Sequence, residues 1–287
     1  MIDRVDLLVV GGLTIDRFAD GRLASGGSVT HAGLAAAGLG ARIATLTVCG
    51  DEPEAAAGIA RLRRQGPVIR QPSPTTVTFA HSERDGRRVL VFERGCHPLA
   101  DPAIRQAPRA RVALLAPIAD ELPPGAIEAL RRSAAAERVV LLAQGWLRSL
   151  RPGEEVAPLA LDQLAPEVLA SFSTVDAIVL STEDLADGAG DPFAQARLLR
   201  EVVGTRPLLA VTLGADGFIL DDPSAPRLVA SVPRRVVRGV PSVGAGDAFG
   251  AGLALALGRG TPLAAAEAGA DAVIGMLEGR RGSNGGP

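Results

Sequence analysis

A short stretch near the C-terminal end carries residues that could bind a phosphate and move a proton. Gly244-Ala245-Gly246 is followed by Asp247 and by a run of good helix formers that ends near Gly258. Small residues let a ligand approach the backbone, and the first amides of a helix have no partner within it. The turn therefore predicts an anion site. An amide cradle beside a carboxylate suits phosphoryl transfer, in which the carboxylate takes the proton of the attacking hydroxyl.

The same residues also have a plain structural interpretation. Aspartate is common in the first turn of a helix, so Gly-x-Gly-Asp alone does not establish an active site. The β-branched run Val236–Val240 before the turn predicts a strand, which gives the local order strand, turn, helix. The chain contains no lysine, and its 30 cationic side chains are all arginine. A phosphate site here must therefore use amides, arginine and Mg²⁺.

Strands and helices alternate along most of the chain. We expect strands over residues 5–12, 42–48, 112–116, 139–143, 177–180 and 208–213. This alternation predicts an α/β fold with a doubly wound, mostly parallel central sheet and flanking helices, which binds ligands at the carboxyl ends of its strands. Residues 68–93 break the pattern with short β-rich pieces and the hairpin pair Asp85-Gly86, so we expect a small β lid there. We expect one domain over residues 1–278 with this lid inserted, and a disordered tail over 279–287.

A second set of candidate residues lies near the N-terminus. Asp16 comes just past the first strand, and the loop Gly26-Gly27 follows it. An acid at this edge of a parallel sheet could accept hydrogen bonds from the hydroxyls of a polyol. Asp and Gly are also ordinary turn residues, so this pattern alone leaves both interpretations open.

The two sets of residues together make the chain resemble the ribokinase (PfkB-type) carbohydrate kinases. That family carries Gly-Gly-x-x-x-Asn and then a small-residue helix that ends Leu-Gly-Ala, and here Gly26-Gly27 leads through His31 into Ala35–Ala41. Cys49–Glu52 is similar to the family's Gly-Asp-Asp, and Gly244–Asp247 is similar to its C-terminal signature. The signatures stand in the family's order near opposite ends of the chain. The resemblance therefore covers essentially the whole sequence.

The resemblance implies a role for each matching residue. Asp247 would be the catalytic base, and Gly244-Ala245-Gly246 would form the anion hole. Asp16 and Gly26-Gly27 match positions that bind the acceptor, a sugar or polyol. The loop 212–217 looks like the family's Thr-Leu-Gly-x-x-Gly nucleotide loop, so the resemblance places ATP against Thr212, Gly214 and Gly217.

Several positions depart from the family's pattern. The family's Asn in the first motif is His31 here, whose imidazole could still bond a hydroxyl. The family's Asn-x-x-Glu, which organises Mg²⁺ and phosphate, falls at Ser181–Asp184, where Glu183 or Asp184 could hold a Mg²⁺-bound water. The acid expected before the anion hole is missing from Pro241–Val243, which puts a monovalent-cation site in doubt.

The middle of the chain looks like the inositol-kinase branch of the family. The arrangement Gln144-x-x-x-Arg148, the turn Cys96–Pro98 and Ser181 carry this resemblance, which implies myo-inositol as a candidate acceptor. It places Gln144 and Arg148 at the substrate, and Arg148 could meet a phosphate bidentately. Trp146, the single tryptophan, fits a core position and a substrate-facing position equally well.

Composition excludes several classes of function. The net charge is −2 and the isoelectric point about 6.0, which argues against nucleic-acid and membrane-surface partners. Two cysteines without a signal peptide fit a reducing cytoplasm, and Cys and His lack metal-site spacing. An exposed β lid would allow a homodimer through edge pairing. Two rival functions remain: a non-catalytic sugar or nucleotide sensor on the same fold, and a nucleoside kinase, which 3% aromatic residues disfavour.

Overall fold

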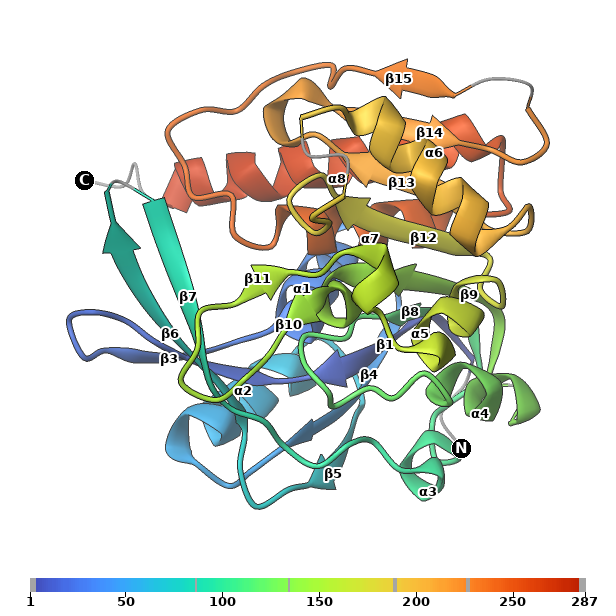
Figure 1. Ribbon diagram of the computed structural model, residues 1–287. Coiled ribbons are helices and arrows are strands. Elements are labelled where there is room, and N and C mark those ends of the chain that lie inside the picture. The colour runs from blue at the N-terminus through green and yellow to red at the C-terminus, as the bar shows by residue number, and fades with distance from the viewer. Residues whose placement is uncertain (1–3, 86, 134, 188–189, 226–227, 284–287) are drawn as a thin grey trace.

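A nine-stranded sheet forms the centre of the computed structural model, which describes residues 4–85, 87–133, 135–187, 190–225 and 228–283 (Figure 1). Across the sheet the strands run β15 (Val229–Ser231), β14 (Phe218–Asp221), β13 (Leu208–Thr212), β12 (Ala177–Ser181), β9 (Ala136–Leu142), β8 (Ala110–Leu115), β1 (Val5–Gly12), β4 (Ile43–Cys49) and β5 (Val68–Pro72). The strands from β13 to β5 pair in parallel, while β14 and β15 are antiparallel. The predicted α/β fold with a mostly parallel sheet is confirmed.

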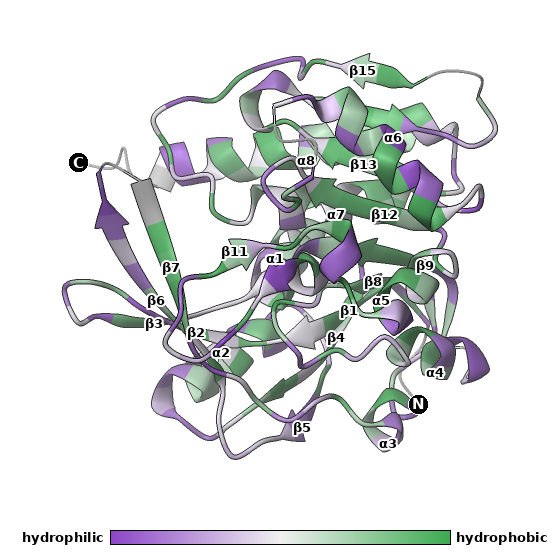
Figure 2. Ribbon diagram, in the orientation of Figure 1, coloured by the Kyte–Doolittle hydropathy of each residue, from purple (hydrophilic) through white to green (hydrophobic). Residues whose placement is uncertain are grey.

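Helices cover both faces of this sheet, because each buried strand presents apolar side chains alternately to the two sides. In β1, Leu7 and Val9 face one core cluster while Leu8 and Val10 face the other. The first cluster is covered by α1 (Ser28–Gly38), α2 (Pro53–Arg63), α7 (Ala245–Ala256) and α8 (Pro262–Ser283). The second is covered by α3 (Asp101–Ile104), α4 (Ala126–Arg132), α5 (Pro166–Phe172) and α6 (Pro192–Val203). Figure 2 shows the central strands in hydrophobic colours and polar stretches on the outer helices.

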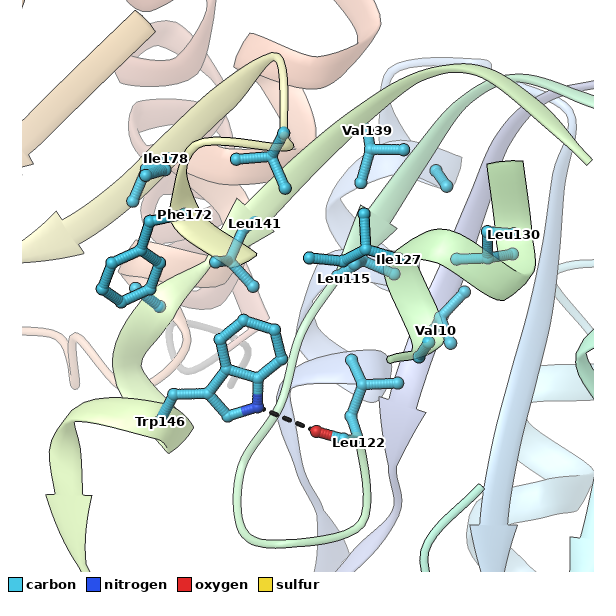
Figure 3. Close-up of a cluster of buried hydrophobic side chains, with 14 of the residues drawn as sticks. Val10, Leu115, Leu122, Ile127, Leu130, Val139, Leu141, Trp146, Phe172 and Ile178 are labelled. Carbon is cyan, nitrogen blue, oxygen red and sulfur yellow. Dashed lines mark hydrogen bonds between the residues drawn. The ribbon is translucent and has the colours of Figure 1, made fainter. Parts of the chain in front are cut away.

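Trp146 belongs to the second core cluster. It lies in the 3₁₀ turn η1 (Ala143–Leu147), is 8% exposed, and packs beside Phe172 with a ring-centroid distance of 6.3 Å. Its indole N–H donates to the carbonyl oxygen of Leu122 at 2.8 Å (Figure 3). Of the two interpretations of this residue, the structure supports the core aromatic.

A separate four-stranded sheet projects from the central one, in the order β3 (Leu23–Gly26), β2 (Thr14–Arg17), β6 (Val77–Arg84) and β7 (Arg87–Arg94). The predicted hairpin is present as the antiparallel pair β6–β7, although Gly86 lies outside the described residues. The predicted bounds of the lid, 68–93, were wrong at the start, because Val68–Pro72 pairs with β4 in the central sheet. The predicted lid also lacked β2 and β3. β2 pairs in parallel with the distant strand β6, which the order of segments along the chain does not reveal, and β3 pairs with β2.

A strap, residues 148–158, joins the two sheets. Its ends pair as β10 (Arg148–Ser149) and β11 (Ala157–Pro158). Between them, Gly153 and Val156 donate backbone hydrogen bonds to β7, and the β7 amide of Phe92 donates to Glu154. The strap thus lies along the β7 edge of the small sheet.

Two other expectations differ from the structure. The run Val236–Val240 forms no strand, and the two arginines just before it form ion pairs with α8, Arg234 with Asp271 and Arg235 with Glu278. The predicted disordered tail is helical up to Ser283 as part of α8, and residues 284–287 lie outside the described part. None of the described helices is long and apolar enough to cross a membrane.

Candidate functional site

A pocket of about 630 Å³ opens where the small sheet faces the carboxyl ends of the central strands. The ends of β12 and β13 supply Ser181 and Thr212, and the starts of two helices supply Gly27-Ser28 and Gly244–Asp247. The small sheet and the strap supply the remaining wall, chiefly Thr14, Asp16, Phe79, His81, Leu90, Arg148, Glu155 and Val156.

The N-terminus of α7 forms one end of the pocket. Gly244 precedes the helix with a left-handed φ of 83°, a conformation that strains any residue with a Cβ. Ala245 starts the helix and Asp247 lies in its first turn. The Ala245 N–H donates to the Ser242 carbonyl oxygen at 2.9 Å. The other first-turn amides have no partner within the helix, and they and the helix dipole favour an anion at this end.

Asp247 is half-buried and lines the pocket. Burial raises the pKa of this carboxyl above its ordinary range. The imidazole of His31, the hydroxyl of Ser28 and the guanidinium of Arg148 oppose the rise in this pKa, and the Asp184 carboxylate adds to it. A carboxylate with a raised pKa is a better proton acceptor than an exposed one.

The glycine motif near the N-terminus builds the start of α1 beside α7. Gly27 is the residue before the helix, with φ 93°, and a Cβ there would lie 2.7 Å from the carbonyl oxygen of Gly12. Thr30 donates its hydroxyl to Gly26 O at 2.9 Å, which holds the first turn. His31 packs directly on Gly244, so the two motifs that are distant in sequence form one surface.

The small sheet carries the predicted acceptor residue Asp16. Its Oδ1 lies 2.9 Å from Nε2 of His81 on β6, and both residues line the pocket. On the opposite side, Asp184 is buried at 3% exposure. One of its oxygens accepts the Ser181 backbone N–H at 2.8 Å, and the other lies 3.4 Å from Nη2 of Arg148. Electrostatic effects of both Arg148 and Asp184 reach Asp247.

The structure brings most of the predicted site residues to this pocket. Those that line it are Asp16, Gly27, His31, Gln144, Arg148, Ser181, Glu183, Asp184, Thr212, Gly214 and Gly244–Asp247. Gly26 and Gly217 do not line it. Gly26 lies under Asp16, and a Cβ on Gly217 would lie 2.0 Å from the Ser231 carbonyl oxygen, so close packing explains both glycines.

Sequence reasoning missed other lining residues, chiefly Thr14, Ser28, Phe79, His81 and Val156. The first two stand next to predicted motif positions, which could have indicated them. His81 and Phe79 share the pocket face of β6 by the two-residue period of a strand, but only the pairing of β6 with β2 shows which face that is.

The described residues contain no group of three or more His, Cys, Asp or Glu side chains suited to a metal. Magnesium in phosphoryl-transfer sites is commonly held by one or two carboxylates together with substrate phosphates. Exposed Glu183 fits such a ligand at the pocket, whereas buried Asp184 already accepts Ser181 N–H and faces Arg148.

The fold and the site together define a ribokinase-like protein: a mostly parallel sheet with a small β sheet over a helix N-terminus that carries Asp247. The sequence matches the pfkB family carbohydrate kinases over residues 14–274, and the chain belongs to that family.

Solved structures of that family share this fold. A pyrophosphate-dependent kinase in the ribokinase family, complexed with a pyrophosphate analog and myo-inositol, has a TM-score of 0.76, 18% identity and 94% coverage of both chains. Adenosine kinase from Sinorhizobium meliloti has a TM-score of 0.70 and 17% identity, with 95% of this chain and 93% of that one covered. Ribokinase from Arabidopsis thaliana, complexed with ribose and ATP, has a TM-score of 0.69 and 16% identity, with 96% and 99% covered. No match to a curated protein was found.

Proposed function

We propose that this chain transfers a phosphoryl group from a phosphate donor to a hydroxyl of a sugar or polyol. The observation that carries the proposal is the Asp247 carboxyl, which lines the pocket from the first turn of α7 beside amides that no helical bond uses. These are the two groups that the reaction needs, a proton acceptor and an anion cradle. Membership of the pfkB family supports the same reaction class.

In the proposed mechanism the acceptor lies between Asp16 and Asp247, with Gly27 and His31 at its side. Asp247 removes the proton of the attacking hydroxyl as its oxygen bonds to the terminal phosphorus of the donor. The bond from that phosphorus to the bridging oxygen breaks, and the rest of the donor leaves, as ADP from ATP or as phosphate from pyrophosphate. The amides of Gly244 and Gly246 hold the charge that develops on the transferring group, since the Ala245 N–H already donates to the Ser242 carbonyl oxygen. Bound Mg²⁺ would neutralise donor phosphates near Glu183.

ATP is the first candidate donor, since the loop 212–217 resembles a nucleotide loop and Thr212 and Gly214 line the pocket. Pyrophosphate is the second candidate, and the pyrophosphate-dependent neighbour favours it. Arg148 and Gln144 would contact the acceptor or its phosphate, and myo-inositol is the acceptor that this neighbour binds.

The edges of the small sheet bear on the proposed homodimer. The strap occupies the β7 edge of the small sheet, so edge pairing between two copies would use β3, which bears the 43%-exposed Leu23. Sedimentation of the wild type and of Leu23→Lys would test this arrangement, since a charge on a pairing edge should favour the monomer.

A matrix of donors and acceptors tests the function. ATP and pyrophosphate are each combined with myo-inositol, ribose, fructose and adenosine, with and without Mg²⁺, and the phosphorylated product is followed by ³¹P NMR. We expect at least one combination to give product with the wild type and far less with Asp247→Asn. Binding of an acceptor without product in every combination would instead support a non-catalytic sensor. Product with adenosine alone would support a nucleoside kinase.

A further inference from the structure

The pocket contains a hydrogen-bonded pair of side chains of which Asp16 matches a family position and His81 does not. His81 on β6 and Asp16 on β2 come from the two adjacent, parallel strands at the middle of the small sheet. The His81 Nε2 atom lies 2.9 Å from Asp16 Oδ1. The two side chains are 10% and 22% exposed, and both residues line the pocket, so the pair is shielded yet accessible to a ligand.

The His81 ring is held in a fixed orientation. Phe18 stacks on it with a ring-centroid distance of 5.1 Å and an interplanar angle of 23°. The guanidinium carbon of Arg22 lies 3.9 Å from the centroid of the Phe18 ring. These three groups belong to β6 and to the turn between β2 and β3, so the turn braces the imidazole at the edge of the pocket.

The Asp16 carboxylate is fixed from two sides. One oxygen contacts His81, as described above. The other lies over Gly26, because the position that a Cβ would take on Gly26 is 2.3 Å from Asp16 Oδ2. An ionised carboxylate can only accept hydrogen bonds, so the His81 nitrogen that faces it must donate. His81 therefore decides which lone pairs of Asp16 remain for a ligand.

We propose that His81 is a positioning residue for the acceptor: it orients the Asp16 carboxylate that receives the acceptor's hydroxyl. This inference rests on the proposed function, since it assigns Asp16 to a polyol or sugar. A carboxylate that is already oriented loses less conformational freedom on binding, so the pair favours acceptor affinity. His81 belongs to the small sheet and not to the start of α7, so we expect it to act on acceptor binding rather than on donor binding.

Kinetics of three variants test the role of His81. His81→Leu removes the N–H that hydrogen-bonds Asp16, and His81→Gln keeps an N–H at a similar reach. His97→Leu makes the same change at an exposed histidine outside the pocket. The acceptor is the most active one of the donor–acceptor matrix, tried first with myo-inositol. We expect His81→Leu to raise the acceptor KM about 10- to 100-fold, with the donor KM within about twofold of wild type. His81→Gln should restore most of the affinity, and His97→Leu should behave as wild type.

A double-mutant cycle separates positioning from a general structural role. In the Asp16→Asn background, His81→Leu should add little further loss, because the oriented carboxylate is already absent. Additive losses, equal effects on the acceptor and donor KM, or failure of His81→Gln to recover affinity would overturn the inference while leaving the kinase assignment intact. Absence of turnover by the wild type with every acceptor would overturn the proposed function itself, and the inference with it.

Discussion

Gly244 and His31 are in direct contact: a Cβ at position 244 would lie 2.6 Å from Cγ of the His31 ring. The contact joins α7 to α1, and with them the two sequence motifs from opposite ends of the chain. Gly244 also has a φ of 83°, so both backbone conformation and space require glycine there. The imidazole thus forms part of the surface on which the α7 amides are displayed.

Gly244→Ala should disturb the anion hole more than the fold. A Cβ would push His31 away and strain the left-handed turn, which costs about 1–3 kcal/mol of unfolding free energy. The displaced amides should lower turnover at least about 100-fold, the usual scale for losing one such donor. Chemical denaturation and steady-state kinetics measure the two effects.

Gly246→Ala is the matched control for stability. A Cβ on Gly246 would meet nothing within 4 Å and the residue is inside α7, so stability should stay equal or rise by up to about 1 kcal/mol. Equal destabilisation by the two substitutions would show that the contact with His31 carries no strain.

Asp247→Asn tests the proposed general base. The amide is nearly isosteric and keeps a hydrogen-bonding oxygen, so the variant should fold and bind the acceptor. It cannot take a proton, and turnover should fall at least about 100-fold. Calorimetric titration with the acceptor beside product formation separates binding from catalysis. Turnover near that of the wild type would remove Asp247 from the role of base.

The charge of Arg148 should affect the pH at which turnover falls on the acid side. Turnover needs the Asp247 carboxylate, so it should rise with pH as this group loses its proton. Burial raises the pKa of Asp247 and the nearby Arg148 guanidinium lowers it. Arg148→Met removes that charge, so the pKa should rise further and the acid limb of kcat should move to higher pH. A shift to lower pH, or none, would contradict this electrostatic link.

The sequence predicted the α/β class and the glycine and acid motifs that line part of the pocket, because both depend on local patterns. Alternating apolar strands indicate a parallel sheet, and glycine beside Asp247 indicates a helix start. The small sheet was harder to predict, since β2 pairs with β6 across some sixty intervening residues and neither strand alone identifies its partner. The interpretation of Val236–Val240 as a strand failed because β-branched residues in a loop have the same local signature.

Trp146→Phe should affect stability rather than substrate binding. The indole N–H bonds the Leu122 carbonyl at 2.8 Å, and Phe cannot replace that donor. We expect a loss of about 1–3 kcal/mol in unfolding free energy with the acceptor KM unchanged, because the ring is in the core. Denaturation followed by circular dichroism and steady-state kinetics provide the measurements. A raised acceptor KM at unchanged stability would place Trp146 at the substrate after all.

Glu121 links the ends of β1 and β8 through a buried carboxyl group. It is 1% exposed, and its oxygens accept backbone N–H groups from Gly12 at 2.9 Å, Ile118 at 2.9 Å and Ala119 at 2.7 Å. Burial outweighs these three donors and raises the pKa of Glu121 to about 7, from an ordinary value of 4.5. The folded state therefore binds this proton more tightly than the unfolded state does.

This difference predicts how stability changes with pH. The contribution of Glu121 is fully present below its unfolded pKa and is lost as the pH rises through the folded value, between about 4.5 and 7. Glu121→Gln has no proton to lose. Its amide also sets an N–H group against a backbone donor, which costs about 1–3 kcal/mol. The variant should thus be clearly less stable than wild type at pH 5, and the gap should narrow toward pH 7.5. Urea denaturation at four pH values, with exposed Glu128→Gln as control, measures the gap, and parallel stability curves would show that Glu121 stays ionised throughout.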